Sequence, residues 1–208
     1  WCGPLLACLY LCSCSQTQWL HGATSIWKVS DPAGDVRLIH PQHPAIGSGT
    51  FDLSSFELLE TETHIIAKAE FVSPVRLIRN IRLSEDRRAS VYPQTVDIYI
   101  DSSPEVGDVK TLPDREVYVP ANEAWDQVLV MSSIRELHTP GTVYASHLIV
   151  RGRTLIGAFP KADINLPIRG ALVLVAATSA RGDGRIRKAS TFKGVCTDWN
   201  QDRCTLLG

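Results

Sequence analysis

The residues best placed for chemistry are two carboxylates and a phenol, Asp97, Tyr99 and Asp101, which occupy every second position of the run Thr95–Asp101. Because side chains alternate between the faces of an extended strand, these three would project from one face, and the apolar residues between them would face a core. Their oxygens could hydrogen-bond a sugar, or could ligate Ca²⁺, which prefers oxygen ligands. The alternatives are a solvent-exposed outer face or a structural network at the edge of a sheet.

A second pair of carboxylates flanks the Pro-Ala-Gly turn, with Asp31 before it and Asp35 after it. Both are candidate ligands for Ca²⁺, although a complete calcium site needs about six oxygens and this loop supplies only a few. Aspartates in such turns also bond their own backbone, which is the structural alternative. We expect no cofactor, with calcium as the one ion that this loop could hold.

Tryptophan side chains are candidate platforms for a sugar, because the apolar face of a sugar ring packs on an aromatic ring. Trp125 and Trp27 could serve in this way, but a tryptophan in a β-sandwich can equally belong to the core. Trp199 lies between two cysteines in a loop-like stretch, so we expect it to be the most exposed of the three.

The two cysteines around Trp199 are Cys196 and Cys204, and they are separated from the other four by most of the chain. An isolated pair in an exported domain is typical of a disulfide, which would stabilise the fold by roughly 2–3 kcal/mol for so short a loop. The alternative is half of a zinc site, which would need two further ligands nearby. No other Cys or His is close in sequence.

The first 24 residues have the composition of an export signal and a short linker. Residues 5–11 form an apolar run that is too short to span a membrane, since a spanning helix needs about twenty apolar residues. The run ends in Leu11-Cys-Ser-Cys14, which resembles a bacterial lipobox and makes Cys14 the predicted lipidation site. A cleaved signal peptide and a buried N-terminal strand are the alternatives. No basic segment or initiator Met precedes the run, so we expect the chain to be clipped there.

Composition and motifs exclude several functional classes. The formal net charge of -1 argues against a broad nucleic-acid surface, which requires clustered positive charge. The sequence has no Gly-x-Ser-x-Gly nucleophile motif and no phosphate-binding glycine loop. Carboxylates are plentiful, so their presence alone does not indicate a glycosidase, which needs two of them across a cleft. We therefore predict a protein that is not an enzyme.

Residues 25–208 are predicted to form one antiparallel β-sandwich, because short strand-like runs alternate with turn residues and no long helical period occurs. Residues 171–177 are apolar on both faces, which favours a central strand covered on both sides. Gly152 and Arg153 form a predicted hairpin turn. Single helical turns could form at residues 121–125 and 132–136. The predicted strands are residues 26–29, 51–59, 64–71, 95–101, 125–131, 142–150, 154–159 and 171–178.

Several of these segments, in their order along the chain, resemble the C-terminal module of bacterial glucodextranases. That family has a DOMON-like β-sandwich, similar to family 9 carbohydrate-binding modules. The resemblance spans Ile26 to the C-terminus and implies a sugar-binding or cell-surface role, such as an accessory module of a glycoside hydrolase. After Asp35 the family usually continues with a tyrosine-containing run that this chain lacks, which leaves a ligand role for that loop in doubt. The matching segments are residues 29–35, 41, 49–57, 96–101, 113–115, 120–125, 171–175 and 184–187.

The resulting hypothesis is an exported, non-catalytic module that binds a polysaccharide or a cell-surface glycan, is secreted or lipid-anchored in the cell envelope, and binds no nucleic acid. Two alternatives remain. Related DOMON-like sandwiches hold b-type haem, for which Met131 with His138 or His147 would supply the axial ligands. The domain could also dock to a partner protein of the cell envelope.

Overall fold

The computed structural model describes residues 19–36, 46–82, 88–103, 107–113, 115, 118–134 and 141–177. Within these ranges the secondary structure is β-strand with short 3-10 turns and no α-helix, which confirms the predicted all-β class. No helix in the described ranges is long and apolar enough to cross a membrane.

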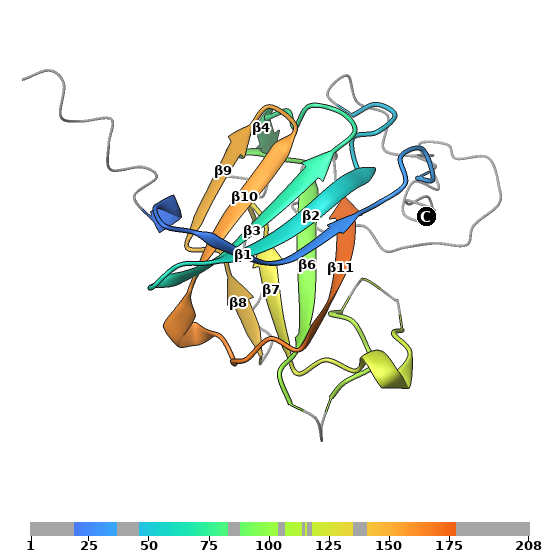
Figure 1. The fold of residues 1–208 in the computed structure, drawn as a ribbon. Coiled ribbons are helices and arrows are strands. Elements are labelled where there is room, and N and C mark those ends of the chain that lie inside the picture. The colour runs from blue at the N-terminus through green and yellow to red at the C-terminus, as the bar shows by residue number, and fades with distance from the viewer. Residues whose placement is uncertain are drawn as a thin grey trace, which may run out of the picture.

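Two packed sheets form the body of the protein, and the five-stranded sheet lies in front of the four-stranded one in Figure 1. The first has the order β1-β2-β3-β10-β9 and the second has the order β11-β6-β7-β8 in the described residues. Neighbouring strands are antiparallel, except that β8 runs parallel to β7. The strands of the first sheet are β1 (Thr24–Ser30), β2 (Leu53–Glu60), β3 (His64–Phe71), β10 (Thr154–Pro160) and β9 (His147–Arg151).

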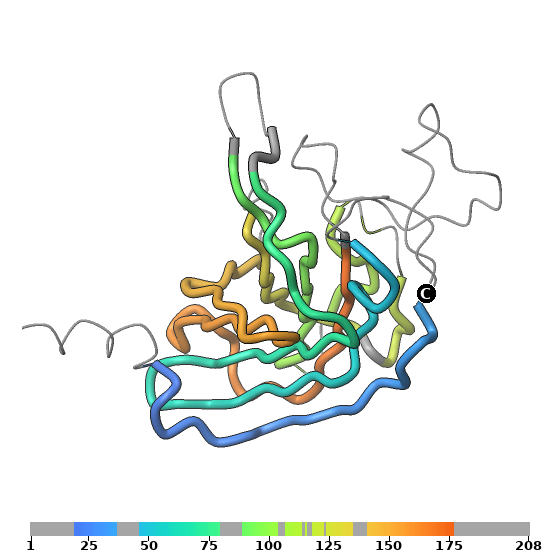
Figure 2. The backbone as a smooth tube through the Cα atoms, turned by 90° about the horizontal axis from the view of Figure 1, so that it is seen from above, coloured from blue at the N-terminus to red at the C-terminus, as the bar shows by residue number. Residues whose placement is uncertain are grey.

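The four-stranded sheet consists of β11 (Gly170–Ala177), β6 (Gln94–Asp101), β7 (Gln127–Met131) and β8 (Thr142–Tyr144). A further ribbon pairs β4 (Ile78–Arg82) with β5 (Arg88–Val91), two strands that the sequence pattern did not predict. Figure 2 shows this ribbon projecting away from the two sheets. The 3-10 turns are η2 (Ala121–Glu123) and η3 (Lys161–Asp163), and η2 confirms the helical turn predicted at this point.

The core lies between the two sheets and is built from alternate residues of their strands. Val96, Ile98 and Ile100 of β6 are fully buried there, which confirms the alternation predicted for this run. Phe56 of β2 and Phe159 of β10 meet them from the facing sheet. Each such side chain contributes roughly 1.5–3 kcal/mol by leaving water, so this layer is the main stabilising element of the domain.

The sheets approach each other closely where Gly157 of β10 lies against Met131 of β7. A Cβ atom added to Gly157 would lie 2.7 Å from Cγ of Met131, a distance that leaves no room for a larger side chain. Met131 is itself fully buried. Glycine is therefore required here for packing between the sheets.

Residues 142–150, predicted as one strand, form two strands that belong to different sheets. The chain crosses between the sheets at two consecutive residues: the Ala145 N–H donates to Val130 O at 3.0 Å, and the Ser146 N–H donates to Ala158 O at 2.8 Å. β8 therefore completes the second sheet and β9 the first. The predicted hairpin at Gly152 and Arg153 is confirmed, with Gly152 at a φ of 62° between β9 and β10.

The central position predicted for residues 171–177 is not found among the described residues. In the described residues β11 is the last strand of its sheet and pairs with β6 alone. Its two apolar faces are nevertheless both used, because Val173 packs into the core and Leu172 packs into a separate apolar cluster on the outer face. The second predicted helical turn is absent from its described part, since residues 133 and 134 form a bend.

Candidate functional site

The long connection from β6 to β7 covers the outer face of the four-stranded sheet. We call residues 107–125 the covering segment, of which 114, 116 and 117 lie outside the described residues; it is yellow-green in Figure 1. Its apolar side chains pack on the outward residues of β6 and β7, which would otherwise face water. The resulting cluster contains Tyr99, Leu112, Val119, Trp125, Val128 and Val130.

Backbone hydrogen bonds fold the covering segment into a short ribbon. Asp108 and Trp125 form an antiparallel bridge, in which the Trp125 N–H donates to Asp108 O at 3.0 Å. Lys110 and Tyr118 form a second antiparallel bridge, and the Val119 N–H donates to Val109 O at 2.9 Å. The segment is therefore held by regular pairing and is not a free loop.

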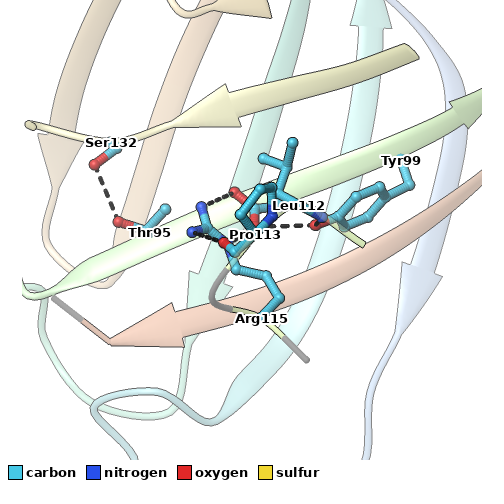
Figure 3. Close-up of polar contacts among 7 residues, drawn as sticks. Thr95, Tyr99, Leu112, Pro113, Arg115 and Ser132 are labelled. Atoms are coloured by element: carbon cyan, nitrogen blue, oxygen red, sulfur yellow. Dashed lines mark hydrogen bonds and ion pairs between the residues drawn. The ribbon is translucent and has the colours of Figure 1, made fainter. Parts of the chain in front are cut away.

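An ion pair beneath this ribbon joins Arg115 to Asp97, and Figure 3 shows Arg115 reaching over the strands of the sheet. Nε of Arg115 donates to Oδ2 of Asp97 at 2.6 Å, and Nη2 donates to Oδ1 at 3.2 Å. The side chains are 1% and 0% exposed. Nη1 also donates to Pro113 O at 3.3 Å. This two-pronged geometry satisfies both carboxylate oxygens, as a buried charge pair requires.

Tyr99 completes the network from the same strand as Asp97. Its hydroxyl donates to Oδ2 of Asp97 at 3.3 Å and accepts a hydrogen bond from the Leu112 N–H at 3.2 Å, as drawn in Figure 3. Burial and the nearby charge of Asp97 raise the pKa of the Tyr99 phenol. The phenol therefore stays protonated at neutral pH and can donate to Asp97.

These contacts correct the prediction that Asp97, Tyr99 and Trp125 contact a ligand. Asp97 and Tyr99 are 0% and 1% exposed, and the ring of Trp125 lies edge-on to that of Tyr99 at 5.0 Å between centroids. The covering segment closes this face of the sheet, so a ligand in solution cannot reach the three side chains. The Asp97 carboxylate and the Tyr99 phenol belong to a structural network, which was the alternative. Asp101, at the end of β6, remains half-buried.

Arg115 and Asp126 are two functional positions that sequence reasoning did not select. Asp126 closes the base of the long connection, because its carboxylate accepts hydrogen bonds from Ser102 N and Oγ, at 2.9 and 2.8 Å, and from Ser103 N at 2.9 Å. Burial alone would raise the pKa of Asp126, but the hydrogen bonds from Ser102, Asn165 and Ser103 together outweigh it, so the pKa is lowered. The Pro-Asp-Arg motif could have indicated Arg115, whereas nothing in the sequence links Asp126 to Ser102.

The outward face of the covering segment carries a third residue that sequence reasoning missed. Tyr118 is 68% exposed, whereas the flanking Val119 is buried in the outer cluster. Lys110 and Asp108 are also exposed and lie on the same ribbon. The Val117-Tyr-Val119 alternation is the only signal in the sequence that could have indicated an outward-facing tyrosine here.

The turn predicted between Asp31 and Asp35 is present, with residues 33 and 34 at its centre. Gly34 has a φ of 92°, and its N–H donates to Oδ2 of Asp52 at 2.7 Å. Burial, followed by the charges of Asp35 and Asp52, raises the pKa of Asp31. In the described ranges no group of three or more His, Cys, Asp or Glu side chains is placed to hold a metal ion. Calcium binding by Asp31 and Asp35 stays a prediction.

The haem ligands proposed from sequence do not come together where the structure describes them. Met131 packs in the core between the sheets, against Gly157. His147 lies on the opposite face of the five-stranded sheet, where its ring is 5.7 Å from that of Trp19. One iron could not bind both, and His138 lies outside the described residues.

The remaining predicted positions fall into two groups. Trp27 is half-buried and lies edge-on to Phe56 at 5.8 Å between ring centroids, so it serves the core. The others, which are Cys14, Cys196, Trp199 and Cys204, lie outside the described residues, and their roles stay predictions.

The model of a family described as the C-terminal binding module, SLH-like, of glucodextranase matches residues 26–195, which is more than half of the chain. No curated protein matches the chain at a significant level.

Proposed function

Because this chain belongs to the family of C-terminal, SLH-like binding modules of glucodextranase, we propose that it is a non-catalytic module that binds carbohydrate at or outside the cell surface. The match over residues 26–195 is the observation that carries this proposal, since it covers both sheets and the covering segment. The family is described as a binding module, which supports a role in ligand recognition without catalysis. The expected ligand is a polysaccharide or another cell-surface glycan.

The arrangement of polar groups on the second sheet supports binding over catalysis. Asp97 and Arg115 neutralise each other in a closed, dry environment, and the Tyr99 phenol is held protonated. None of these groups can act on a bound substrate, because the covering segment separates them from solvent. Their ion pair and hydrogen bonds instead hold the covering segment in one conformation, as a pre-organised binding surface requires.

Retention on immobilised polysaccharides tests the proposal directly. The full chain should be slowed in gels that contain a soluble glucan or mannan, and should be pulled down by insoluble cell-wall polysaccharide. Trp125→Phe is a matched control, because Trp125 is buried and its Nε1 has no hydrogen-bond partner among the described residues. This variant should bind like the parent. A folded chain that binds no member of a broad glycan array would contradict the proposal.

The calcium prediction is tested in the same assay. Binding and thermal unfolding should be measured with added Ca²⁺ and with a chelator, for the parent and for Asp31→Asn with Asp35→Asn. If these two carboxylates hold calcium, the ion should raise the unfolding temperature of the parent and leave that of the double variant unchanged. An identical response of the parent and the double variant to Ca²⁺ would show that Asp31 and Asp35 do not hold calcium.

We further propose that the protein is exported and that Cys14 carries a lipid in the full-length precursor. Metabolic labelling with a clickable fatty acid should mark the parent protein and not Cys14→Ala. The proposed disulfide between Cys196 and Cys204 is tested by mass spectrometry after alkylation. Modification of both thiols without prior reduction would exclude that disulfide.

A further inference from the structure

Among the described residues, Tyr118 is the one Phe, Trp or Tyr that is exposed, with 68% of its surface open to solvent. We propose that Tyr118 is the stacking platform for one sugar ring of a neutral polysaccharide, flanked by Lys110 and Asp108 as hydrogen-bonding partners. This inference rests on the proposed carbohydrate-binding function and assigns the place of contact.

The direction of the ring follows from the alternation of the ribbon. Val109 and Val119 turn inward to the outer apolar cluster, and the residues beside them turn outward. Tyr118 lies directly opposite Lys110 in an antiparallel bridge. Side chains of directly opposed residues share a face, with Cβ atoms roughly 5 Å apart. Tyr118 and Lys110 therefore project side by side into solvent.

The described parts of the ribbon are anchored on both sides of Tyr118. The buried Arg115–Asp97 pair holds it three positions earlier in sequence, and Trp125 holds it from the other side through the bridge to Asp108. An aromatic ring with few rotatable bonds on a fixed backbone loses little conformational entropy on binding. This property suits a shallow contact with one face of a sugar.

The neighbouring charges favour a neutral ligand. Lys110 and Asp108 carry opposite charges two positions apart on the same edge, and Oδ1 of Asp108 is held by a hydrogen bond from the Lys110 N–H at 2.9 Å. A donor and an acceptor beside an aromatic ring complement the hydroxyl groups and the apolar face of a neutral hexose. An anionic polymer would gain from Lys110 but would be repelled by Asp108.

The test compares Tyr118→Ala with Tyr118→Phe in affinity gels that contain dextran, a linear β-glucan or polygalacturonate. The parent should bind one of the neutral glucans. Tyr118→Ala, which lacks the ring, should bind that glucan about tenfold more weakly or worse, whereas the affinity of Tyr118→Phe should stay within about threefold of the parent's. Asp108→Asn and Lys110→Met should each weaken binding by a few-fold. Leu77→Ala is the matched control, because Leu77 is also exposed, at 41%, and lies outside the covering segment.

The outcomes separate this inference from the proposed function. If the parent binds a neutral glucan and Tyr118→Ala binds it equally well, the platform is elsewhere and only the inference fails. Binding of polygalacturonate alone would overturn the assignment of a neutral ligand. If the parent binds no glycan at all, the proposed function fails and the inference fails with it. Thermal unfolding of Tyr118→Ala should match the parent, since the ring is exposed.

Discussion

Arg115 and Asp97 form an ion pair without contact to solvent, with Nε 2.6 Å from Oδ2. The two residues are 18 positions apart, one in the covering segment and one in the middle of β6. Placing two charges in a protein interior is costly unless all their hydrogen-bonding groups are satisfied. Tyr99 and Pro113 provide additional partners, so the pair fixes where the covering segment lies on the sheet.

Replacing Arg115 with methionine should destabilise the protein by about 3–5 kcal/mol, because Asp97 would remain as an uncompensated buried charge. Urea unfolding monitored by tryptophan fluorescence measures this change. The double variant Asp97→Leu with Arg115→Met should lose less than the sum of the two single variants, because it leaves no unpaired charge. Strict additivity would contradict the proposed coupling.

The surface pair Lys68–Glu57 provides a comparison for this experiment. These side chains are 33% and 22% exposed and their charged atoms lie 3.5 Å apart. Lys68→Met should change the free energy of unfolding by no more than about 1 kcal/mol, since solvent screens the pair. A similar cost for Lys68→Met and Arg115→Met would show that burial is not the deciding factor.

Tyr99→Phe should lower the free energy of unfolding by about 1–3 kcal/mol, because the Leu112 N–H would lose its acceptor and Asp97 one of its donors. The ring and its packing against Trp125 are retained, so the loss measures the hydroxyl alone. Amide hydrogen exchange at Leu112 should become faster in the variant. Unchanged exchange at this amide would argue against the hydrogen bond.

The stabilising contribution of the Asp126 carboxylate should be lost in acid. Its pKa in the folded state lies below the usual 3.8, because hydrogen bonds from Ser102, Asn165 and Ser103 together outweigh burial, which alone would raise it. A carboxyl whose pKa is lower in the folded than in the unfolded state stabilises the protein. This stabilisation is present in full above the pKa of the unfolded state, and it is lost as the pH falls through the pKa of the folded state. The contribution should therefore disappear below about pH 4.

Asp126→Asn tests this dependence through unfolding curves measured at a series of pH values. The variant should be less stable than the parent near neutral pH, and the difference should shrink as the pH falls below about 4. The measurement needs no ligand and is independent of the binding assays. A difference that stays constant with pH would show that the carboxylate charge is not responsible.

Gly157→Ala should destabilise the protein by about 1–3 kcal/mol, because the added Cβ would lie 2.7 Å from Cγ of Met131 and 3.3 Å from Cβ of Ala145. Gly170→Ala is the control, since a Cβ there would meet no heavy atom within 4 Å. Thermal unfolding of the two variants gives the comparison. Equal unfolding temperatures would mean that the two sheets are not closely packed at this point.

Local pattern predicted much of the fold. The alternation of residues 64–71 and 95–101 predicted β3 and β6 and the inward side chains of β6, because period two follows from the geometry of a strand. Gly152 with Arg153 predicted a hairpin turn because glycine readily adopts a positive φ. The order of short segments along the chain indicated the family, which the match over residues 26–195 confirms.

Tertiary contacts decided what the outer face of β6 does. A strand face in water and a strand face under a covering segment can both show the alternation of Asp97 and Tyr99. The residue that distinguishes the two cases is Arg115, which lies 18 positions away from Asp97. The crossing at Ala145 and Ser146 is also invisible in the sequence, because both halves of that run have strand propensity. By itself the sequence determined most of the strands of the two sheets and which of their side chains share a face, since these depend on near neighbours. Which face is buried, and so which aromatic residue remains for a ligand, depended on contacts between distant segments.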